Sequence, residues 1–178
     1  MRIVECVPNF SEGRDKDKIN AIVREIETVP GVKLLDVDPG ESTNRTVMTF
    51  IGEPEAVKEA AFKAIGKAAE VLDMRTHKGA HSRIGATDVC PFVPVSGVTM
   101  EDCVRLAHEL GGRVAGELGI PVYLYEEAAQ KPGRRNLANI RAGEYEGLPE
   151  KLKDPRWVPD FGDPIFNPKS GETVIGAR

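Results

Sequence analysis

Near the middle of the chain the sequence reads His77-Lys78-Gly79-Ala80-His81-Ser82-Arg83-Ile84-Gly85-Ala86-Thr87-Asp88-Val89-Cys90-Pro91-Phe92-Val93-Pro94. Two of the three histidines and two basic side chains lie within its first seven residues, near two glycines that let backbone and ligand approach closely. From Ile84 onward the residues are apolar and β-prone, which predicts a buried strand entered from a polar loop. Because such a loop gives access while the strand holds its side chains in place, we expect the chemistry of the protein here.

Periodic apolar residues on both sides of this stretch indicate a domain with helices and strands. Helical spacing predicts helices over residues 15–29, 54–73 and 99–118, the last behind a capping-box pattern at Thr99 and Asp102. Alternation and short apolar runs predict strands over residues 2–8, 32–37, 45–51, 84–95 and 122–125. This order predicts an α/β (α+β) fold: a ferredoxin-like βαββαβ core with an added helix and strand, and a mixed sheet with helices on one face. The other sheet face would then be available to another domain or subunit.

Two segments lack a periodic pattern. Residues 9–13 are expected to form a loop, and residues 149–178, rich in proline and glycine, a wrapped loop without packed elements. Asp88 is an exception of another kind, because it is an acid in an otherwise apolar strand and needs a partner if it is buried.

The composition excludes several classes of protein. A net charge of −4 and the absence of an RNP1-like aromatic string argue against a nucleic-acid partner. No apolar run approaches the roughly 18 residues of a membrane span, and the start of the sequence lacks the pattern of a signal peptide. We therefore expect a cytoplasmic protein without a membrane partner. Its three cysteines share no metal-binding spacing and are expected to be reduced core residues.

A metal site is not expected at the two clustered histidines. The i, i+4 spacing of His77 and His81 would place both rings on one face only in a helix, and Gly79 argues against a helix there. Neither flanking residue supplies the glutamate of an HExxH motif.

Several strings of residues together resemble one known family. The strings are Val4–Gly13, Leu35–Asp38, Ser42–Val47, His77–Pro94, Pro121–Tyr125, Arg141–Glu146 and Pro159–Gly162. Through them the chain resembles, over its whole length, the amino-terminal subdomain of glutamate formimidoyltransferase, which in animals is fused to a cyclodeaminase. The resemblance implies that residues 1–178 form this subdomain, while the carboxy-terminal subdomain is absent from the chain.

The resemblance also implies an activity and a set of site residues. The family transfers a formimino group between N-formimino-L-glutamate and tetrahydrofolate, in histidine degradation and one-carbon metabolism, within a tunnel between two subdomains. Its catalytic base, the second histidine of the loop, falls on His81. Its folate-contacting stretch matches Gly162, Asp163, Pro164, Ile165, Phe166, Asn167, Pro168, Lys169, Ser170 and Gly171. Tetrahydrofolate would be a co-substrate.

The chemistry of such a transfer suits a histidine. Transfer of an amidine between amines requires a group that takes a proton from the attacking nitrogen and returns one to the leaving nitrogen, which imidazole does near neutral pH. Both substrates carry carboxylates, and the cations nearest in sequence are Arg45, Lys78 and Arg83.

An acid facing the reacting carbon would stabilise the cationic amidine. Asp36, Asp38 and Asp88 are available, and we choose Asp88. Alternatively Asp88 orients His81, or it only bonds local backbone.

The sequence leaves two functional readings open. Relatives continue beyond Val174–Arg178, so the second half would come from the rest of a longer chain, a separate polypeptide or a second copy, and we expect a homo-oligomer. The rival to an enzyme is a non-catalytic subdomain that binds folate or another anion and needs a separate second half for activity.

Overall fold

The structure is a computed structural model that describes residues 1–178. Its strands are β1 (Ile3–Cys6), β2 (Asn9–Phe10), β3 (Val32–Gly40), β4 (Arg45–Gly52), β5 (Thr87–Ser96), β6 (Val122–Glu126) and β7 (Thr173–Ala177). Its helices are α1 (Lys16–Glu27), α2 (Pro54–Val71), α3 (Met100–Leu118), α4 (Leu137–Arg141) and α5 (Leu148–Lys151). Short 3₁₀ turns lie at Met74–Thr76, Tyr145–Gly147 and Pro155–Trp157.

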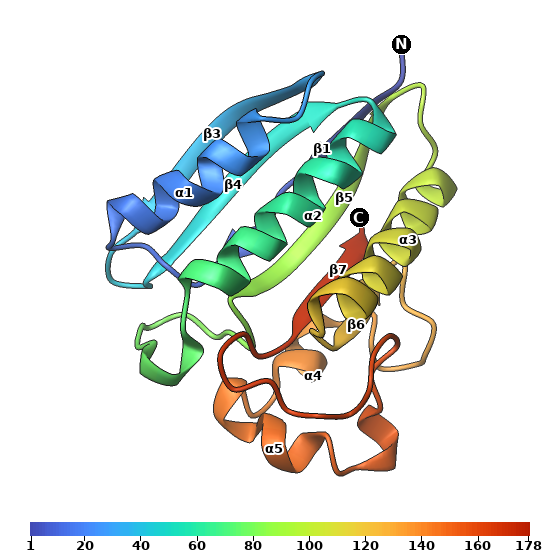
Figure 1. Ribbon diagram of the computed structural model, residues 1–178. Helices are drawn as coiled ribbons and strands as arrows, with labels where there is room; N and C mark the ends of the chain where they lie inside the picture. The colour runs from blue at the N-terminus through green and yellow to red at the C-terminus, as the bar shows by residue number, and fades with distance from the viewer.

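All strands belong to one mixed sheet. The strand order is β3, β4, β1/β2, β5, β7, β6, where β1 and β2 follow one another along the same position between β4 and β5. β1 is antiparallel to both β4 and β5, and β3 is antiparallel to β4, whereas β7 runs parallel to β5 and β6. Together with α1 and α2, the strands β1, β3, β4 and β5 form the predicted ferredoxin-like unit, so the predicted fold class is confirmed. In Figure 1 the three long helices lie side by side on one face of this sheet.

The long helices are stabilised because each buries an apolar stripe against that face of the sheet. In α2 the buried stripe is mostly alanine, which lets the helix approach the strands closely, while Val57 and Ile65 fill the remaining space. α3 begins at the predicted capping box of Thr99 and Asp102 and ends at Gly119 in the left-handed conformation (φ 67°). The main core beneath these helices contains 31 buried residues, among them Cys6, Cys90 and Cys103, all of which are free thiols.

The expectation of a loop over residues 149–178 is wrong for its last part. β7 lies between β5 and β6, and all five of its residues are buried. The run Thr173–Ala177 is too short and too close to glycines to stand out in the sequence, and its place in the sheet depends on pairing with strands about 50 and 85 residues away. Residues 9–13 also differ from the expectation, because Asn9 and Phe10 form the short strand β2.

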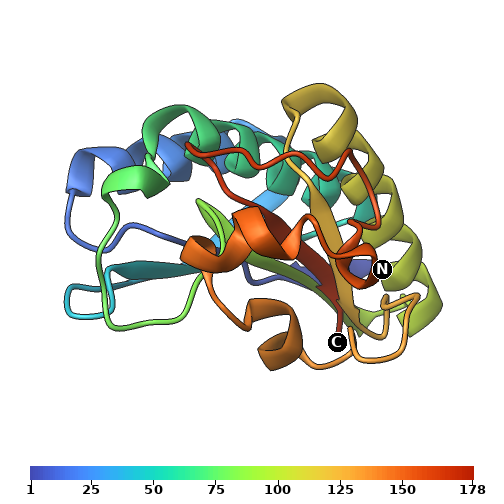
Figure 2. The ribbon, with the colours of Figure 1, turned by 90° about the horizontal axis from the view of Figure 1, so that it is seen from below.

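The second sheet face is covered only in part. A second cluster packs Ile140 of α4 and Leu148 of α5 against Tyr123, Tyr125 and Val174. Figure 2 shows α4 on the side of the sheet opposite the three long helices. Over β1, β3 and β4 that face carries partly exposed side chains such as Val47 and Ile51. None of the helices combines the length and the apolar character that a membrane span requires.

Candidate functional site

Asn44, at the tip of the β3–β4 hairpin, holds three segments of the site together. It is buried and adopts a positive φ of 51°, a conformation that asparagine tolerates better than most residues. Its side-chain oxygen accepts from the backbone N–H of Gly13 at 2.9 Å, and its side-chain amide donates to the backbone oxygen of Lys78 at 2.9 Å. Its own backbone oxygen accepts from His77 Nε2 at 3.0 Å. The hairpin tip thus anchors the histidine loop.

His77 and Arg83 form the buried support of that loop. Arg83 Nε donates to His77 Nδ1 at 3.0 Å, so with Nε2 bonded to Asn44 both ring nitrogens are occupied. Burial is the main reason why the pKa of His77 is lowered, and the ring is neutral. Arg83 also pairs with Glu146 at 2.7 Å and Glu144 at 3.3 Å, and the pairing with Arg83 lowers the pKa of Glu146 to about 2. These contacts hold the loop in place and leave Arg83 without a free charge.

The loop between these anchors packs tightly against the hairpin. A Cβ on Gly79 would lie 2.3 Å from the backbone oxygen of Thr43, so only glycine fits there. The next residue, Ala80, donates its N–H to the backbone oxygen of Ser42 at 3.2 Å. His81 follows directly, and its position is therefore fixed by backbone contacts on its N-terminal side.

His81 meets Arg45, the first residue of β4. Arg45 Nη1 lies 2.5 Å from His81 Nε2. Because a guanidinium only donates, Nε2 accepts this bond and the ring proton of the neutral imidazole lies on Nδ1. Nδ1 is buried without a hydrogen-bond partner. Burial lowers the pKa of His81, and the charges of Arg45 and Arg141 lower it further.

Arg45 also lines a pocket of about 340 Å³ on the second sheet face. Two further arginines, Arg141 and Arg178, line the same pocket, and no acidic residue does. The remaining lining is largely apolar: Val7, Asn9, Val89, Pro91, Val93, Tyr125 and Leu137.

Asp88 positions Arg141 rather than His81. Its Oδ1 accepts from the backbone N–H of Ile84 at 2.7 Å, and its Oδ2 accepts from Arg141 Nε at 3.0 Å. No hydrogen bond joins Asp88 to His81. The structure thus agrees with the expectation that a buried Asp88 needs a partner, and of the three roles considered it matches the bond to local backbone. Asp36 and Asp38 on β3 are both exposed.

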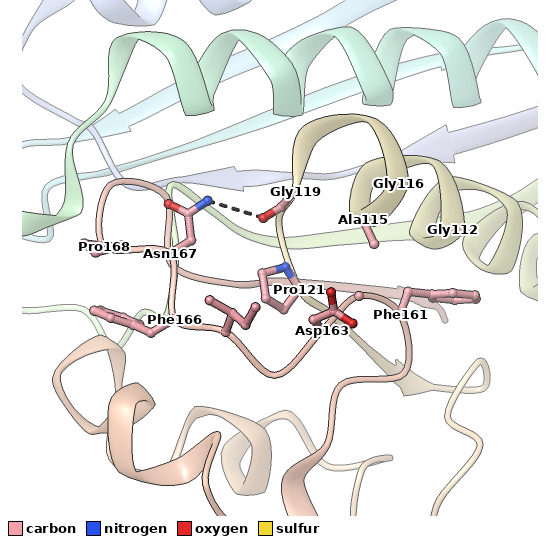
Figure 3. Close-up of a pocket in the computed structure, with 12 residues that line it drawn as sticks. Gly112, Ala115, Gly116, Gly119, Pro121, Phe161, Asp163, Phe166, Asn167 and Pro168 are labelled. Carbon is pink, nitrogen blue, oxygen red and sulfur yellow. Dashed lines mark hydrogen bonds between the residues drawn. The ribbon is translucent and has the colours of Figure 1, made fainter.

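The remaining predicted residues make no hydrogen bond with His81. Lys78 is exposed, and its ammonium group makes no hydrogen bond or ion pair within the chain. Six residues of the folate-matching stretch line a cleft of about 710 Å³ beside α3: Gly162, Asp163, Ile165, Phe166, Asn167 and Pro168. Figure 3 labels Asp163, Phe166, Asn167 and Pro168 along this cleft. The opposite wall consists of small residues of α3 and its C-cap: Gly112, Ala115, Gly116 and Gly119. Pro164 lies in the same loop but does not line the cleft.

The end of that stretch has structural contacts. Lys169 Nζ donates to the backbone oxygens of Ala69 and Glu70 at 2.5 and 2.7 Å, and so caps the C-terminal end of α2. The backbone oxygen of Ser170 accepts from the N–H of Ala86 at 2.8 Å, and Gly171 pairs with Gly85. The stretch therefore runs from the cleft to the strand entrance next to the histidine loop. His81 and Arg45 do not line the cleft.

The sequence reasoning did not single out Asn44, Arg141 or Arg178 as site residues. A sequence signal existed for Asn44 and Arg141, because both belong to strings that carry the resemblance to the family. The need of Asp88 for a buried partner was a further signal for Arg141, but which cation would meet it is decided by the tertiary structure.

Comparison with known proteins bears on the same residues. Residues 3–178 match the family described as "Formiminotransferase domain, N-terminal subdomain". The formimidoyltransferase-cyclodeaminase of Gallus gallus is 60% identical over 177 residues, covering 99% of this chain and 33% of that protein. The glutamate formimidoyltransferases of Thermoplasma acidophilum and Streptococcus pyogenes serotype M1 are 53% and 47% identical, and the chain spans 59% of each. Since both the family match and these identities extend over essentially the whole chain, the chain belongs to the family of formiminotransferase N-terminal subdomains.

Proposed function

We propose that this chain takes part in the transfer of a formimino group between N-formimino-L-glutamate and tetrahydrofolate, with His81 as general base. The observation that carries the proposal is the state of the His81 ring. It is neutral, and its Nε2 lone pair points at the guanidinium of Arg45, which lines a pocket together with Arg141 and Arg178. Names of relatives that include glutamate formimidoyltransferase support the same reaction.

The proposed step is a proton relay around one carbon. An amine nitrogen of tetrahydrofolate attacks the amidine carbon and forms a new C–N bond, which leaves that carbon tetrahedral. His81 Nε2 takes the proton of the attacking nitrogen and returns it to the glutamate nitrogen as the old C–N bond breaks. Proton transfer of this kind contributes about 10²- to 10⁴-fold to a rate. The lowered pKa of His81 keeps the base unprotonated at neutral pH.

The cations divide into two groups in this proposal. Arg45 and Lys78 have side chains that a substrate carboxylate can reach, and we assign them that role. Arg83 was predicted alongside them, but its two glutamate partners and its bond to His77 fit a role in positioning the loop better.

Folate is assigned to the cleft along Gly162–Pro168. Its volume lies within the range of about 300–1,000 Å³ that is usual for small-molecule sites. Phe166 offers an aromatic ring there, packed 5.4 Å from the ring of Tyr145. Because the cleft does not contain His81, a folate molecule held there has to extend past the end of the stretch to reach the base.

We also propose that a second subdomain, in the same chain or another, completes the tunnel. The partly exposed sheet face over β1, β3 and β4 and the greater length of the relatives support this. A second copy of this chain is the other candidate, which would make the protein a homo-oligomer.

The test is transfer activity in a protein that contains both subdomains. His81→Ala is expected to lower turnover by about 10²- to 10⁴-fold without changing the thermal midpoint. His108→Ala is the control, because His108 lies on α3 outside the histidine loop, where its ring bonds to Gln130 and meets Phe161 edge-on. Near wild-type turnover in His81→Ala would remove His81 as the base. A wild-type protein that binds tetrahydrofolate but transfers nothing would instead favour the non-catalytic binding subdomain.

A further inference from the structure

Arg45 belongs to two groups of residues at once. One nitrogen of its guanidinium contacts the imidazole of His81, while the side chain also lines the pocket shared with Arg141 and Arg178. It is the only residue that has both contacts. Anything that changes its position in the pocket therefore changes the environment of His81.

The contact with Arg45 blocks the basic atom of His81. A neutral imidazole has one free lone pair, and here it lies on Nε2, where the guanidinium donates to it at 2.5 Å. The other nitrogen, Nδ1, carries the proton and has no partner. As long as Arg45 stays in place, His81 has no free lone pair with which to accept a proton from a substrate.

The pocket holds more positive charge than the chain neutralises. Asp88 is the acid bonded to this group, and its two oxygens are already taken by the N–H of Ile84 and by Arg141. Asp38 contributes a favourable charge to Arg45 from β3 but is exposed to solvent. Burial and the charge of Arg141 lower the pKa of Arg45, as expected for a cation with too little compensation. A carboxylate is the chemical group that such a pocket attracts.

We propose that a carboxylate of the glutamate part of the substrate enters the three-arginine pocket, draws Arg45 away from His81 and thereby frees Nε2 to act as the base. Arg45 is then a positioning residue that couples recognition of a dicarboxylate to activation of the histidine. This inference rests on the proposed function and adds the order of events at that site.

The test measures the histidine itself rather than turnover. The chain is labelled with ¹⁵N in its histidine rings and titrated by NMR with glutarate, a dicarboxylate that carries no transferable group. Without ligand, His81 should show the Nδ1–H tautomer and a pKa below its usual value. The charged groups that act on it are Arg45 of β4, Arg141 of α4 and Asp88 of β5. Saturating glutarate should raise the pKa of His81 by at least about one pH unit, since one nearby opposite charge shifts a pKa by about 1–3.

Variants separate coupling from a general charge effect. Arg45→Met should raise the pKa of His81 without ligand and abolish its response to glutarate. Arg45→Lys keeps the positive charge and should therefore bind glutarate in part. It serves as the second variant if Arg45→Met folds poorly. Arg105→Met is the matched control, because Arg105 is half-exposed on α3 and pairs with Glu109; the response of His81 should remain that of the wild type. Glutaramide, the neutral diamide, should produce no change.

Two results would overturn the coupling. One is a pKa of His81 that does not move in a large excess of glutarate. The other is an unchanged glutarate response in Arg45→Met. Neither depends on transfer, so this inference can fail while His81→Ala still abolishes activity. Conversely, retained activity in His81→Ala would remove the proposed function even if glutarate shifts the histidine.

Discussion

Glu172, immediately before β7, is a buried carboxyl group whose charge the fold does not compensate. It is 0% exposed, and neither side-chain oxygen has a hydrogen-bond partner. Burial raises its pKa to about 8, although Lys151 and Arg134 act in the opposite direction. The pKa of an unperturbed glutamate is 4.5. The folded state therefore holds a proton that the unfolded state releases between these two values.

The sign of the effect on stability follows from linkage. Between about pH 4.5 and pH 8 the native state binds more protons than the unfolded state, so the free energy of unfolding falls as the pH rises. Each pH unit of the difference corresponds to about 1.4 kcal/mol, so above pH 8 the buried carboxylate costs ~5 kcal/mol. Glu172→Gln keeps the shape and removes the charge. Its amide is buried without partners, as is the protonated carboxyl that it replaces, so this cost largely cancels and the net gain at pH 9 approaches ~5 kcal/mol.

Urea unfolding of wild type and Glu172→Gln at pH 5, 7 and 9 provides the measurement. The gain in unfolding free energy from the substitution should be smallest at pH 5 and grow steadily with pH. Other titrating groups cancel because both proteins contain them. Glu150→Gln is the control: Glu150 is exposed and pairs only with Lys153, so the change should stay within about 0.5 kcal/mol at every pH. If Glu172→Gln is no more stable at pH 9 than at pH 5, relative to wild type, the reasoning is refuted.

The remaining predictions concern the support of His81. Gly79→Ala should lower the free energy of unfolding by about 1–3 kcal/mol, because its Cβ would lie 2.3 Å from the backbone oxygen of Thr43. It should also lower the transfer rate in a protein with both subdomains. An unaltered NMR spectrum of the His81 ring would contradict this. Arg141→Met should cost about 3–5 kcal/mol in urea unfolding at pH 7, because it strands the Asp88 carboxylate, and adding Asp88→Asn should recover much of the loss. The pKa of His77 is lowered, so its contribution to stability is present above about pH 6.5 and is lost as the pH falls. His77→Gln should therefore make the free energy of unfolding depend less on pH between pH 7 and pH 5. An equally steep dependence in the variant would argue against a buried neutral ring.

Local patterns were sufficient for most of the elements. The apolar stripes of α1, α2 and α3 recur at helical spacing, and the capping box of Thr99 marks a helix start within four residues. The order of these helices and their strands was enough to predict the ferredoxin-like core, because few topologies satisfy short connections and right-handed crossovers. The position of His81 in a loop that enters a buried strand also followed from the order of polar and apolar residues.

The tertiary structure alone decided the end of the chain and the partners of the site. β7 is stabilised by pairing on both sides with distant strands, and Thr173–Ala177 carries no local signal of that partnership. From the sequence, Arg83 was predicted to be available to a substrate, whereas in the fold it pairs with Glu144 and Glu146. Arg141 is held at the pocket by its hydrogen bond to Asp88. The chemical nature of a residue is encoded locally, whereas its charge state and availability depend on neighbours that are distant in sequence. For that reason the sequence could single out His81, but only the fold revealed that Arg45 covers its basic nitrogen.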